Sequence, residues 1–159
     1  MLAGIGRATA LRLAAEGADV ACLDVAGSLS GFPGYGTAGP DELAEVVSEI
    51  EARGRRALAL SADVCDHDAV RAAVELATDA LGPISLVANV AGGAGFGLGA
   101  GPLLSLDERE FRKVVDLNLT GTWIVCRETI TRMIDTGIPG RVVNVSSQAG
   151  KVGFPLLGA

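Results

Sequence analysis

Apolar residues along the chain alternate between the spacing of an amphipathic helix and the short continuous runs of buried strands. Over residues 7–16 they recur at separations of three, four and seven residues, which predicts a helix. The predicted apolar face of this helix consists of Ala8, Leu11, Ala14 and Ala15. Gly17 takes the left-handed position that ends many helices, and a compact apolar run closed by Asp24 then predicts a strand over 20–24.

The same alternation continues to residue 147. The later predicted elements are, in order, a helix from Pro40 to about Arg53, a strand over 56–62, a helix capped by Asp66 and ended by Gly82, a strand over 84–90, a long helix opened by the capping box Ser105–Leu–Asp–Glu108 and reaching about Ile134, and a strand over 141–147. Glycine-rich segments over 25–39 and 91–101 predict loops, and residues 148–159 are loop-like.

Strict alternation of helices and strands favours an α/β fold, with a doubly wound parallel sheet covered by helices on both faces. A chain of 159 residues can bury one core, so we expect a single domain over 1–159. Ligands of such sheets bind beyond the carboxyl ends of the strands. The polar residues predicted at those ends are Asp24, Asp63, Asn89 and Ser147.

Composition and charge exclude several functional classes. A net charge of −6 leaves no basic stripe for nucleic acid. No apolar run reaches the roughly 18 residues of a membrane span, and the first residues lack a signal core. The three cysteines are far apart, which favours reduced thiols and a cytoplasmic location. With His67 as the only histidine we expect no metal site, and His67 is predicted to be solvated at a helix start.

Glycines before the first helix indicate a nucleotide site. Gly4 and Gly6 would let the backbone approach a pyrophosphate, and the helix N-terminus would supply N–H groups and positive potential. Asp24 follows at about 20 residues, where an acid accepts hydrogen bonds from ribose hydroxyls. An ordinary glycine turn before a helix remains the alternative for this segment on its own.

Several segments together resemble one family over essentially the whole chain. They are Gly4–Ile5–Gly6–Arg7–Ala8, Asp24, Asp63–Val64, Asn89–Val90–Ala91–Gly92, Asn118 and Val145–Ser146–Ser147. Their order is similar to that of the short-chain dehydrogenase/reductase family. The resemblance implies a Rossmann-type domain in an oxidoreductase that moves a hydride between a nicotinamide cofactor and an alcohol or ketone. Tyr35, the segment 40–45 and Gly54–Arg55–Arg56 resemble the carveol and mycofactocin-associated branch.

The resemblance implies roles for the cofactor residues. Gly4, Ile5 and Gly6 would contact the cofactor phosphates. Asp24 resembles the acid that selects NAD, and with no basic residue beside it NADP is disfavoured. The remaining cofactor-binding residues implied by the resemblance are Asp63 and Val64 at the adenine, and Asn89, Ala91 and Gly92 in a segment whose Val90 departs from the family's second asparagine.

Two residues resemble catalytic positions of the family. Ser147 resembles the serine that hydrogen-bonds the substrate oxygen, and Asn118 the asparagine whose backbone helps to hold a water in a proton relay. Taken alone, Ser146 and Ser147 could be turn residues at a strand end, and Asn118 could be a polar group at a helix kink.

Other parts of the family pattern are missing. The family's proton donor is a tyrosine followed by a lysine four residues later, but Tyr35 is followed by Gly39 at that spacing. The family's first strand and first glycine are also absent. That strand would lie centrally, so its absence would leave two strands facing each other across an unpaired gap. We therefore expect an internal fragment of a longer enzyme that is inactive and folds poorly alone.

Alternatives to the dehydrogenase remain. A non-catalytic nucleotide-binding module would keep the cofactor site without chemistry, whereas a methyltransferase with a Rossmann fold is disfavoured by the Asn89–Gly92 and Val145–Ser147 segments. The segments 93–104 and 152–157 are apolar and favour a hydrophobic alcohol or carbonyl substrate. The family resemblance further implies a homo-oligomer formed through the long helix that contains Asn118.

Overall fold

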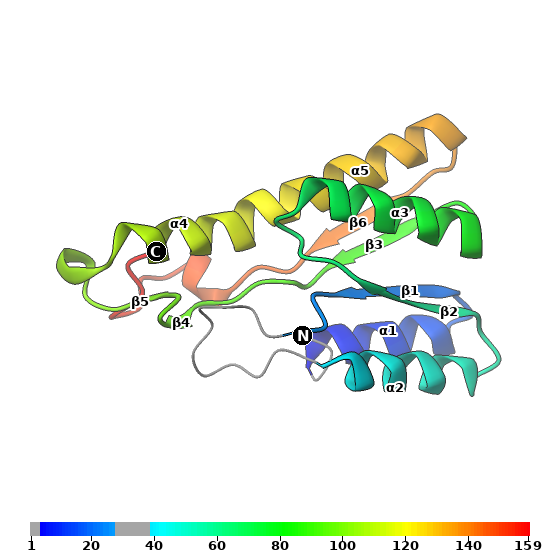
Figure 1. Ribbon diagram of the computed structural model, residues 1–159, viewed down its shortest axis with the longest axis horizontal. Coiled ribbons are helices and arrows are strands. Elements are labelled where there is room, and N and C mark those ends of the chain that lie inside the picture. Colours follow the sequence, from blue (N-terminus) through cyan, green and yellow to red (C-terminus); the bar gives the residue numbers. More distant parts are fainter. Residues whose placement is uncertain (1–3, 28–38) are drawn as a thin grey trace.

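The computed structural model describes residues 4–27 and 39–159 (Figure 1). Its main elements are α1 (Ile5–Ala15), β1 (Val20–Asp24), α2 (Pro40–Glu51), β2 (Ala57–Ser61), α3 (His67–Leu81), β3 (Leu86–Asn89), β4 (Gly95–Phe96), β5 (Gly99–Ala100), α4 (Glu108–Val115), α5 (Gly121–Thr136) and β6 (Arg141–Asn144). The predicted order of helices and strands is confirmed. Most of the predicted loop over 25–39, with Tyr35, lies outside the described residues.

The four longer strands form two parallel pairs within one α/β arrangement, and the two-residue strands β4 and β5 pair with each other. β1 pairs with β2 and β3 pairs with β6, each in parallel. Figure 1 shows α1 and α2 on one side of the strands and α3 and α5 on the other. Helices therefore cover both faces, as expected for a doubly wound Rossmann-type fold.

The core consists of small aliphatic clusters between these layers. The first joins α1, β1 and α2, and its buried residues are Ala10, Ala14, Cys22, Leu43, Val46 and Ile50. Two further clusters join α3 to β2 and α3 to α5. The predicted buried face of α1 was partly wrong, because Ala10 is buried while Ala8 and Ala15 are exposed. Alanine occurs all around this helix, so its apolar spacing does not define one face.

A cavity of about 530 Å³ separates the two strand pairs. Its walls include β1, residues 20–24, and β3, residues 86–89. In the described part of the chain, neither strand forms a ladder with the other across this space. The unpaired gap that we expected from the sequence is therefore present, and backbone groups of β1 and β3 face it without a strand partner.

The helix ends follow local side-chain chemistry, with one correction. The Asp66 carboxylate caps α3 by accepting a hydrogen bond from the Ala69 N–H at 3.0 Å, as predicted. The capping box at Ser105 was wrong. The N-cap of α4 is Asp107, which accepts from the Arg109 N–H at 2.7 Å, and the Ser105 hydroxyl instead donates to the Pro102 carbonyl within a 3₁₀ turn. Asp107 is closer to the helix start and takes the cap.

The long helix is not a continuous α-helix. A π-helical turn over Asp116–Thr120 separates α4 from α5, and the Gly121 N–H donates to the Asp116 carbonyl five residues back. Asn118 lies at the centre of this turn. The sequence predicted one long helix here and kept a kink at Asn118 as the alternative. π turns inside α-helices occur frequently at functional sites. No helix in the described ranges has the length and apolar character needed to cross a membrane.

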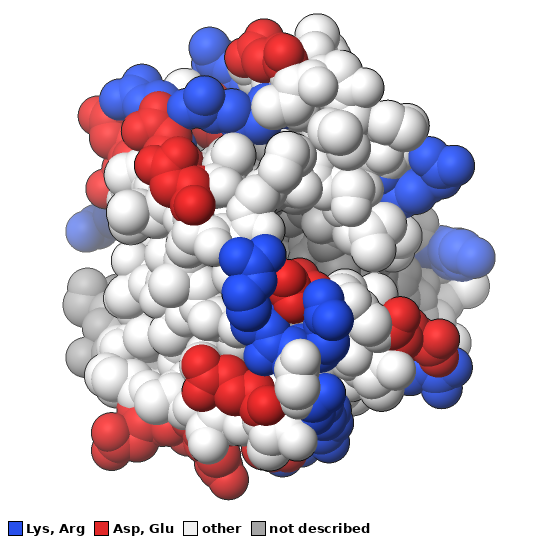
Figure 2. Space-filling view, turned by 90° about the vertical axis from the view of Figure 1, so that its right-hand side faces the viewer, with Lys and Arg blue, Asp and Glu red and all other residues white. Residues whose placement is uncertain are grey.

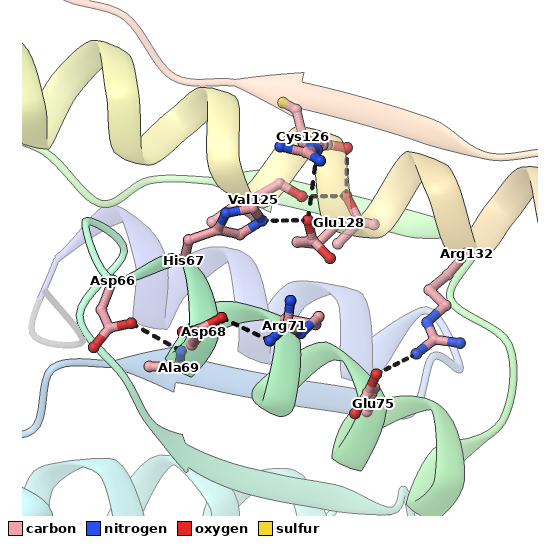
Figure 3. A network of polar contacts seen from close by, with 12 residues as sticks. Asp66, His67, Asp68, Ala69, Arg71, Glu75, Val125, Cys126, Glu128 and Arg132 are labelled. Carbon is pink, nitrogen blue, oxygen red and sulfur yellow. Dashed lines mark hydrogen bonds and ion pairs between the residues drawn. The ribbon is translucent and has the colours of Figure 1, made fainter.

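His67 lies at a helix start and is partly exposed, as predicted, but its side chain also has a partner. It is the first residue of α3, and its Nε2 lies 2.7 Å from Oε1 of Glu128 on α5 (Figure 3). The side chains of His67 and Glu128 are 36% and 15% exposed. A second interhelical ion pair joins Glu75 to Arg132 at 2.7 Å. These contacts tie α3 to α5, and the sequence could not indicate them because Glu128 is distant along the chain.

Acidic and basic side chains are interspersed at the end of the molecule where β1 and β2 begin (Figure 2). Arg56 bonds Asp19 through its backbone N–H and its Nε, at 3.0 and 2.8 Å, and donates to the Ala80 and Leu81 carbonyls at the end of α3. The backbone hydrogen bond from Arg56 is the main cause of a lowered pKa at Asp19. Arg56 therefore joins Asp19, just before β1, to the end of α3, and its charge is paired with the Asp19 carboxylate.

Candidate functional site

Four strands end on the same edge of the molecule and bring the predicted polar residues together there. Asp24 and Asn89 are the last residues of β1 and β3, and Asp63 follows the end of β2. The residues that the sequence assigned to a cofactor and that line the cavity are Gly6, Asp24, Asp63, Val64, Asn89, Ala91 and Gly92. Gly4 and Ile5 precede them at the start of α1, and Ile5 is exposed.

The start of α1 provides backbone donors. Gly4 is the N-cap residue, and no side chain among the described residues caps its amide groups. No acidic residue lies in the first turn. The positive end of the helix is therefore not neutralised by its own side chains, which suits an anionic group.

Asp24 is a buried carboxylate at the end of β1, with 7% of its surface exposed. Its backbone carbonyl accepts from the Ala62 N–H at 3.0 Å, which extends the β1–β2 pairing by one bond. The Ala26 N–H lies 3.4 Å from Oδ1 of the Asp24 carboxylate, a long contact within a tight turn. The carboxylate is thus placed by the strand and the turn that follows it.

Asp63 and Val64 occupy the turn between β2 and α3. The Asp63 carboxylate accepts from the Cys65 N–H at 2.9 Å. Val64 is buried against Gly121, where an added Cβ would lie 2.7 Å from a Val64 methyl carbon. Burial, followed by the negative charge of Asp63, raises the pKa of the Cys65 thiol to about 12.

Asn118 holds the loop that follows β3. Its side-chain oxygen accepts from the Gly93 N–H at 2.9 Å, and its Nδ2 donates to the Gly93 carbonyl at 2.8 Å. A Cβ at Gly92 would lie 2.6 Å from that side-chain oxygen, so only glycine allows this approach. The sequence predicted a role for the Asn118 backbone, whereas the observed contacts with the loop use its side chain.

The Asn118 backbone carbonyl also has a partner. The Thr122 hydroxyl donates to it at 2.9 Å, one turn further along the helix. Asn118 Nδ2 donates additionally to the Val114 carbonyl at 3.0 Å. The π turn therefore lies between the cofactor-side loop and the body of the helix, with the Asn118 side chain bonded to both.

Ser147 follows β6 at the same edge and is exposed. Its hydroxyl accepts from the Ala149 N–H at 3.2 Å and begins a short 3₁₀ turn over Gln148–Gly150. Ser147 is not among the residues that line the cavity. Its observed contact is that of a turn residue, and its catalytic role stays a prediction.

Two residues that the sequence did not single out contact the site. Asn89 Nδ2 donates to Oδ1 of Asn144 at 2.8 Å and to the Cys126 sulfur at 3.2 Å. Asn144 interrupts an apolar run just before Ser146 and Ser147, and this was the available sequence signal. Cys126 offered none, because it is one of three unclustered cysteines.

The two apolar segments over 93–104 and 152–157 contact each other beside the site. Ala100 forms an antiparallel bridge with Leu157, and the Gly101 N–H donates to the Leu156 carbonyl at 2.7 Å. Leu103 and Leu104 nearby are largely exposed. No group of three or more side chains suited to binding a metal gathers within the described ranges.

Comparison with known proteins gives a consistent picture. An uncharacterised NAD-dependent oxidoreductase of Mycobacterium tuberculosis is 39% identical over 94% of this chain and 53% of its own length. A (−)-trans-carveol dehydrogenase of Rhodococcus erythropolis is 36% identical over 95% of this chain and 53% of its own. The crystal structure of a carveol dehydrogenase from Mycobacterium avium in complex with NAD superposes with a TM-score of 0.90, at 29% identity, over 96% of this chain and 54% of that one.

The chain spans about half the length of the curated relatives it matches. The family model described as short chain dehydrogenase matches residues 1–159. The chain therefore belongs to the short-chain dehydrogenase family.

Proposed function

We propose that this chain supplies the cofactor-binding part of an oxidoreductase that transfers a hydride between NAD(H) and an alcohol or ketone. The observation that supports this most is the placement of Asp24, Asp63 and Asn89 at the same ends of parallel strands, with Gly92 in the loop that follows β3. The similarity to an NAD-dependent oxidoreductase and to an NAD-bound carveol dehydrogenase supports the same cofactor.

The residues fit a dinucleotide. The uncapped N-terminus of α1, with Gly4 and Gly6, is suited to the pyrophosphate, and the Asp24 carboxylate can accept hydrogen bonds from ribose hydroxyls. The missing Cβ at Gly92 makes room for the Asn118 side chain, which holds the loop that follows β3. We assign the adenine side to Asp63 and Val64. When bound, NAD supplies the site that accepts or returns the hydride.

A carboxylate at the ribose favours NAD over NADP, because it would repel a 2′-phosphate. The described cation in the same glycine segment, Arg7, forms an ion pair with Glu49 of α2. This pairing directs the guanidinium toward α2. NAD is therefore the proposed cofactor.

Ser147 and Asn118 are the proposed catalytic residues. The exposed Ser147 hydroxyl can donate a hydrogen bond to a substrate oxygen, since its contact with Ala149 uses it only as an acceptor. Asn118 bonds the loop at Gly93 through its side chain. We assign its backbone carbonyl, which accepts one hydrogen bond from Thr122 and has a second lone pair, the role of holding a water.

We propose that residues 1–159 belong to one NAD-binding domain of a longer polypeptide, in which a further parallel strand fills the gap between β1 and β3. The open edges of both strands and the relatives' greater length support this. The proposed proton donor, a tyrosine with its lysine, would also come from that polypeptide. The 159-residue chain alone is then inactive.

We infer the class of substrate and the oligomeric state from apolar residues at two places, beside the strand ends and along the long helix. The meeting of the 100–101 and 156–157 segments beside the strand ends supports a hydrophobic alcohol or ketone. Leu119, Trp123, Ile130 and Ile134 lie at i, i+4, i+11 and i+15 of the long helix and are all exposed. An exposed apolar stripe of this kind supports a homo-oligomer formed through this helix.

The test compares Ser147→Ala with wild type in the polypeptide as its source cell makes it. NAD and (−)-trans-carveol are the probes for turnover, and NADH fluorescence gives the cofactor Kd. Loss of one hydrogen-bond donor to a reacting oxygen typically lowers kcat by roughly 100-fold. We expect that loss, with the NADH Kd unchanged. Ser146→Ala, at the exposed neighbouring residue, is the matched control and should keep its kcat.

The outcomes separate the alternatives. Turnover that survives Ser147→Ala contradicts the role of Ser147. Binding of NADH without turnover of carveol or other hydrophobic alcohols supports a non-catalytic nucleotide-binding module. Absence of NADH binding overturns the proposed function.

A further inference from the structure

Three side chains from three elements meet where β3 and β6 end. Asn89 and Asn144 are register partners and the last residues of their strands. Asn89 Nδ2 donates to Oδ1 of Asn144 at 2.8 Å and to the Cys126 sulfur at 3.2 Å, and the Cys126 thiol lies 3.5 Å from the same Asn144 oxygen. We call these three residues the strand-end triad.

Cys126 completes the triad from α5. Figure 3 shows its sulfur directed away from α3 and toward β6. A protonated thiol can accept one hydrogen bond and donate another. Cys126 accepts a hydrogen bond from Asn89 Nδ2 and donates one to Oδ1 of Asn144. Serine could perform both functions, whereas alanine could perform neither.

The triad lies at the point where two functional segments separate. Just beyond it, the Asn89 carbonyl accepts from the Val145 N–H at 2.9 Å, which extends the β3–β6 pairing by one bond. The segment after β3 then enters the loop over 90–93, which Asn118 holds, and the segment after β6 continues to Ser147. The relative position of these segments is therefore set at the end of the strand pair.

We propose that Cys126 and Asn144 are positioning residues for the proposed reaction. Through Asn89 they fix how far the loop over 90–93 lies from Ser147. This inference rests on the proposed function. Asp24 ends β1 and Asp63 follows β2, in the other strand pair. The hydrogen bonds of the triad join only Asn89, Cys126 and Asn144, so loss of the triad should reduce turnover more than cofactor affinity.

The experiment uses Cys126→Ala, Cys126→Ser and Asn144→Ala in the native polypeptide. Turnover is measured with NAD and (−)-trans-carveol, and hydrogen–deuterium exchange is followed in peptides over 86–93 and 141–147. Displacements of about 1 Å near reacting groups can lower rates up to 100-fold, so we expect kcat to fall about 10-fold in both alanine variants. The KM for NAD should stay within about 2-fold, while exchange at both strand ends becomes faster.

Rescue by serine distinguishes positioning from packing. Cys126→Ser should keep kcat and exchange within about 2-fold of wild type, because the hydroxyl retains both hydrogen-bonding functions. Val143→Ala is the control, since Val143 is exposed, precedes Asn144 and has no part in the triad. Equal impairment by alanine and serine at position 126 would assign Cys126 a packing role and overturn the inference.

The two proposals can fail separately. Wild-type protein without turnover would refute the dehydrogenase, yet exchange would still have to become faster at both strand ends in Cys126→Ala and not in Cys126→Ser. Unchanged exchange and kcat in Cys126→Ala would overturn the role of the triad while leaving the dehydrogenase intact. If Asn144→Ala does not fold, the two Cys126 variants still decide.

Discussion

Gly92 shows how one missing Cβ can shape the site. Its backbone lies against the Asn118 side chain, and alanine would place a carbon 2.6 Å from Oδ1. The Asn118 side-chain amide would have to move and would lose its two hydrogen bonds to the Gly93 backbone. Overpacking of this kind costs roughly 1–3 kcal/mol, so we predict that Gly92→Ala weakens NADH binding about 10-fold.

Gly153→Ala is the control for this prediction. A Cβ at the exposed Gly153 meets nothing within 4 Å, and Gly153 does not line the cavity. Its NADH Kd, measured by fluorescence titration, should remain within about 2-fold of wild type, in line with a surface substitution. Equal weakening by both variants would refute the contact with Asn118 as the cause.

Cys65 should be unreactive although its residue is exposed. Burial of the thiol and the charge of Asp63 raise its pKa from 9.0 to about 12. At pH 8 the thiolate fraction falls about 1,000-fold, and the greater nucleophilicity of a more basic thiolate offsets part of this. We predict iodoacetamide labelling about 50-fold slower than for N-acetylcysteine, as measured by peptide mass mapping.

Asp63→Asn tests the electrostatic part of this effect. Removal of the carboxylate charge lowers the thiol pKa, so labelling of Cys65 should become faster, although burial keeps it slower than a free thiol. Labelling of Cys65 at the rate of N-acetylcysteine in the wild type would contradict the prediction.

For single residues, the sequence predicted where a side chain lies in the fold better than which other side chains it contacts. Asp24, Asp63 and Asn89 were placed at strand ends because parallel strands end on one edge, and this needs only the apolar runs. Asn144 and Cys126 were missed because their partner, Asn89, is far away in sequence. The pairing of His67 with Glu128 was missed for the same reason.

At the element scale, the cap of α3 offers a stability test. The Asp66 carboxylate accepts from the Ala69 N–H at 3.0 Å. Asp66→Ala should lower the free energy of unfolding by about 1 kcal/mol in urea titrations of the native polypeptide. Asp68→Ala removes a negative charge from the same turn without removing the cap, and should cost only a few tenths of a kcal/mol. Equal losses would contradict the capping contribution.

Element boundaries were predicted where one signal dominated. Pro40 begins α2 and Gly82 follows α3, because their backbone preferences leave few alternatives. Ser105 and Asp107 both could cap the next helix, and pattern alone favoured the wrong one. The π turn itself was not predicted. Asn118 at its centre bonds Gly93 in a loop 25 residues earlier, and the helical pattern does not show such a contact.

For the whole molecule, the gap between β1 and β3 is the main feature. Both strands have an unpaired edge along a cavity of about 530 Å³. The sequence predicted this gap from the family order of strands. Its size and lining could not be predicted, because they depend on how α1, α3 and α5 pack around it.

Hydrogen exchange tests whether a further strand fills this gap. In the isolated 159-residue chain, backbone amides of β1 and β3 that face the cavity should exchange readily, because unpaired edge groups lack ladder bonds. In the native polypeptide the same amides should be protected, with α2 amides as the internal reference. Equal protection in both proteins would contradict a strand at this position.

The π turn over Asp116–Thr120 has a consequence for the length of the chain. It amounts to one residue inserted into an α-helix, so side chains after it are rotated by about 100° relative to those before it. Deleting one residue there would restore regular α-helical bonding and a single helical phase. The same deletion would turn Ile124 away from α3 and Asn118 away from Gly93. In this segment the number of residues is therefore constrained more tightly than most of their identities.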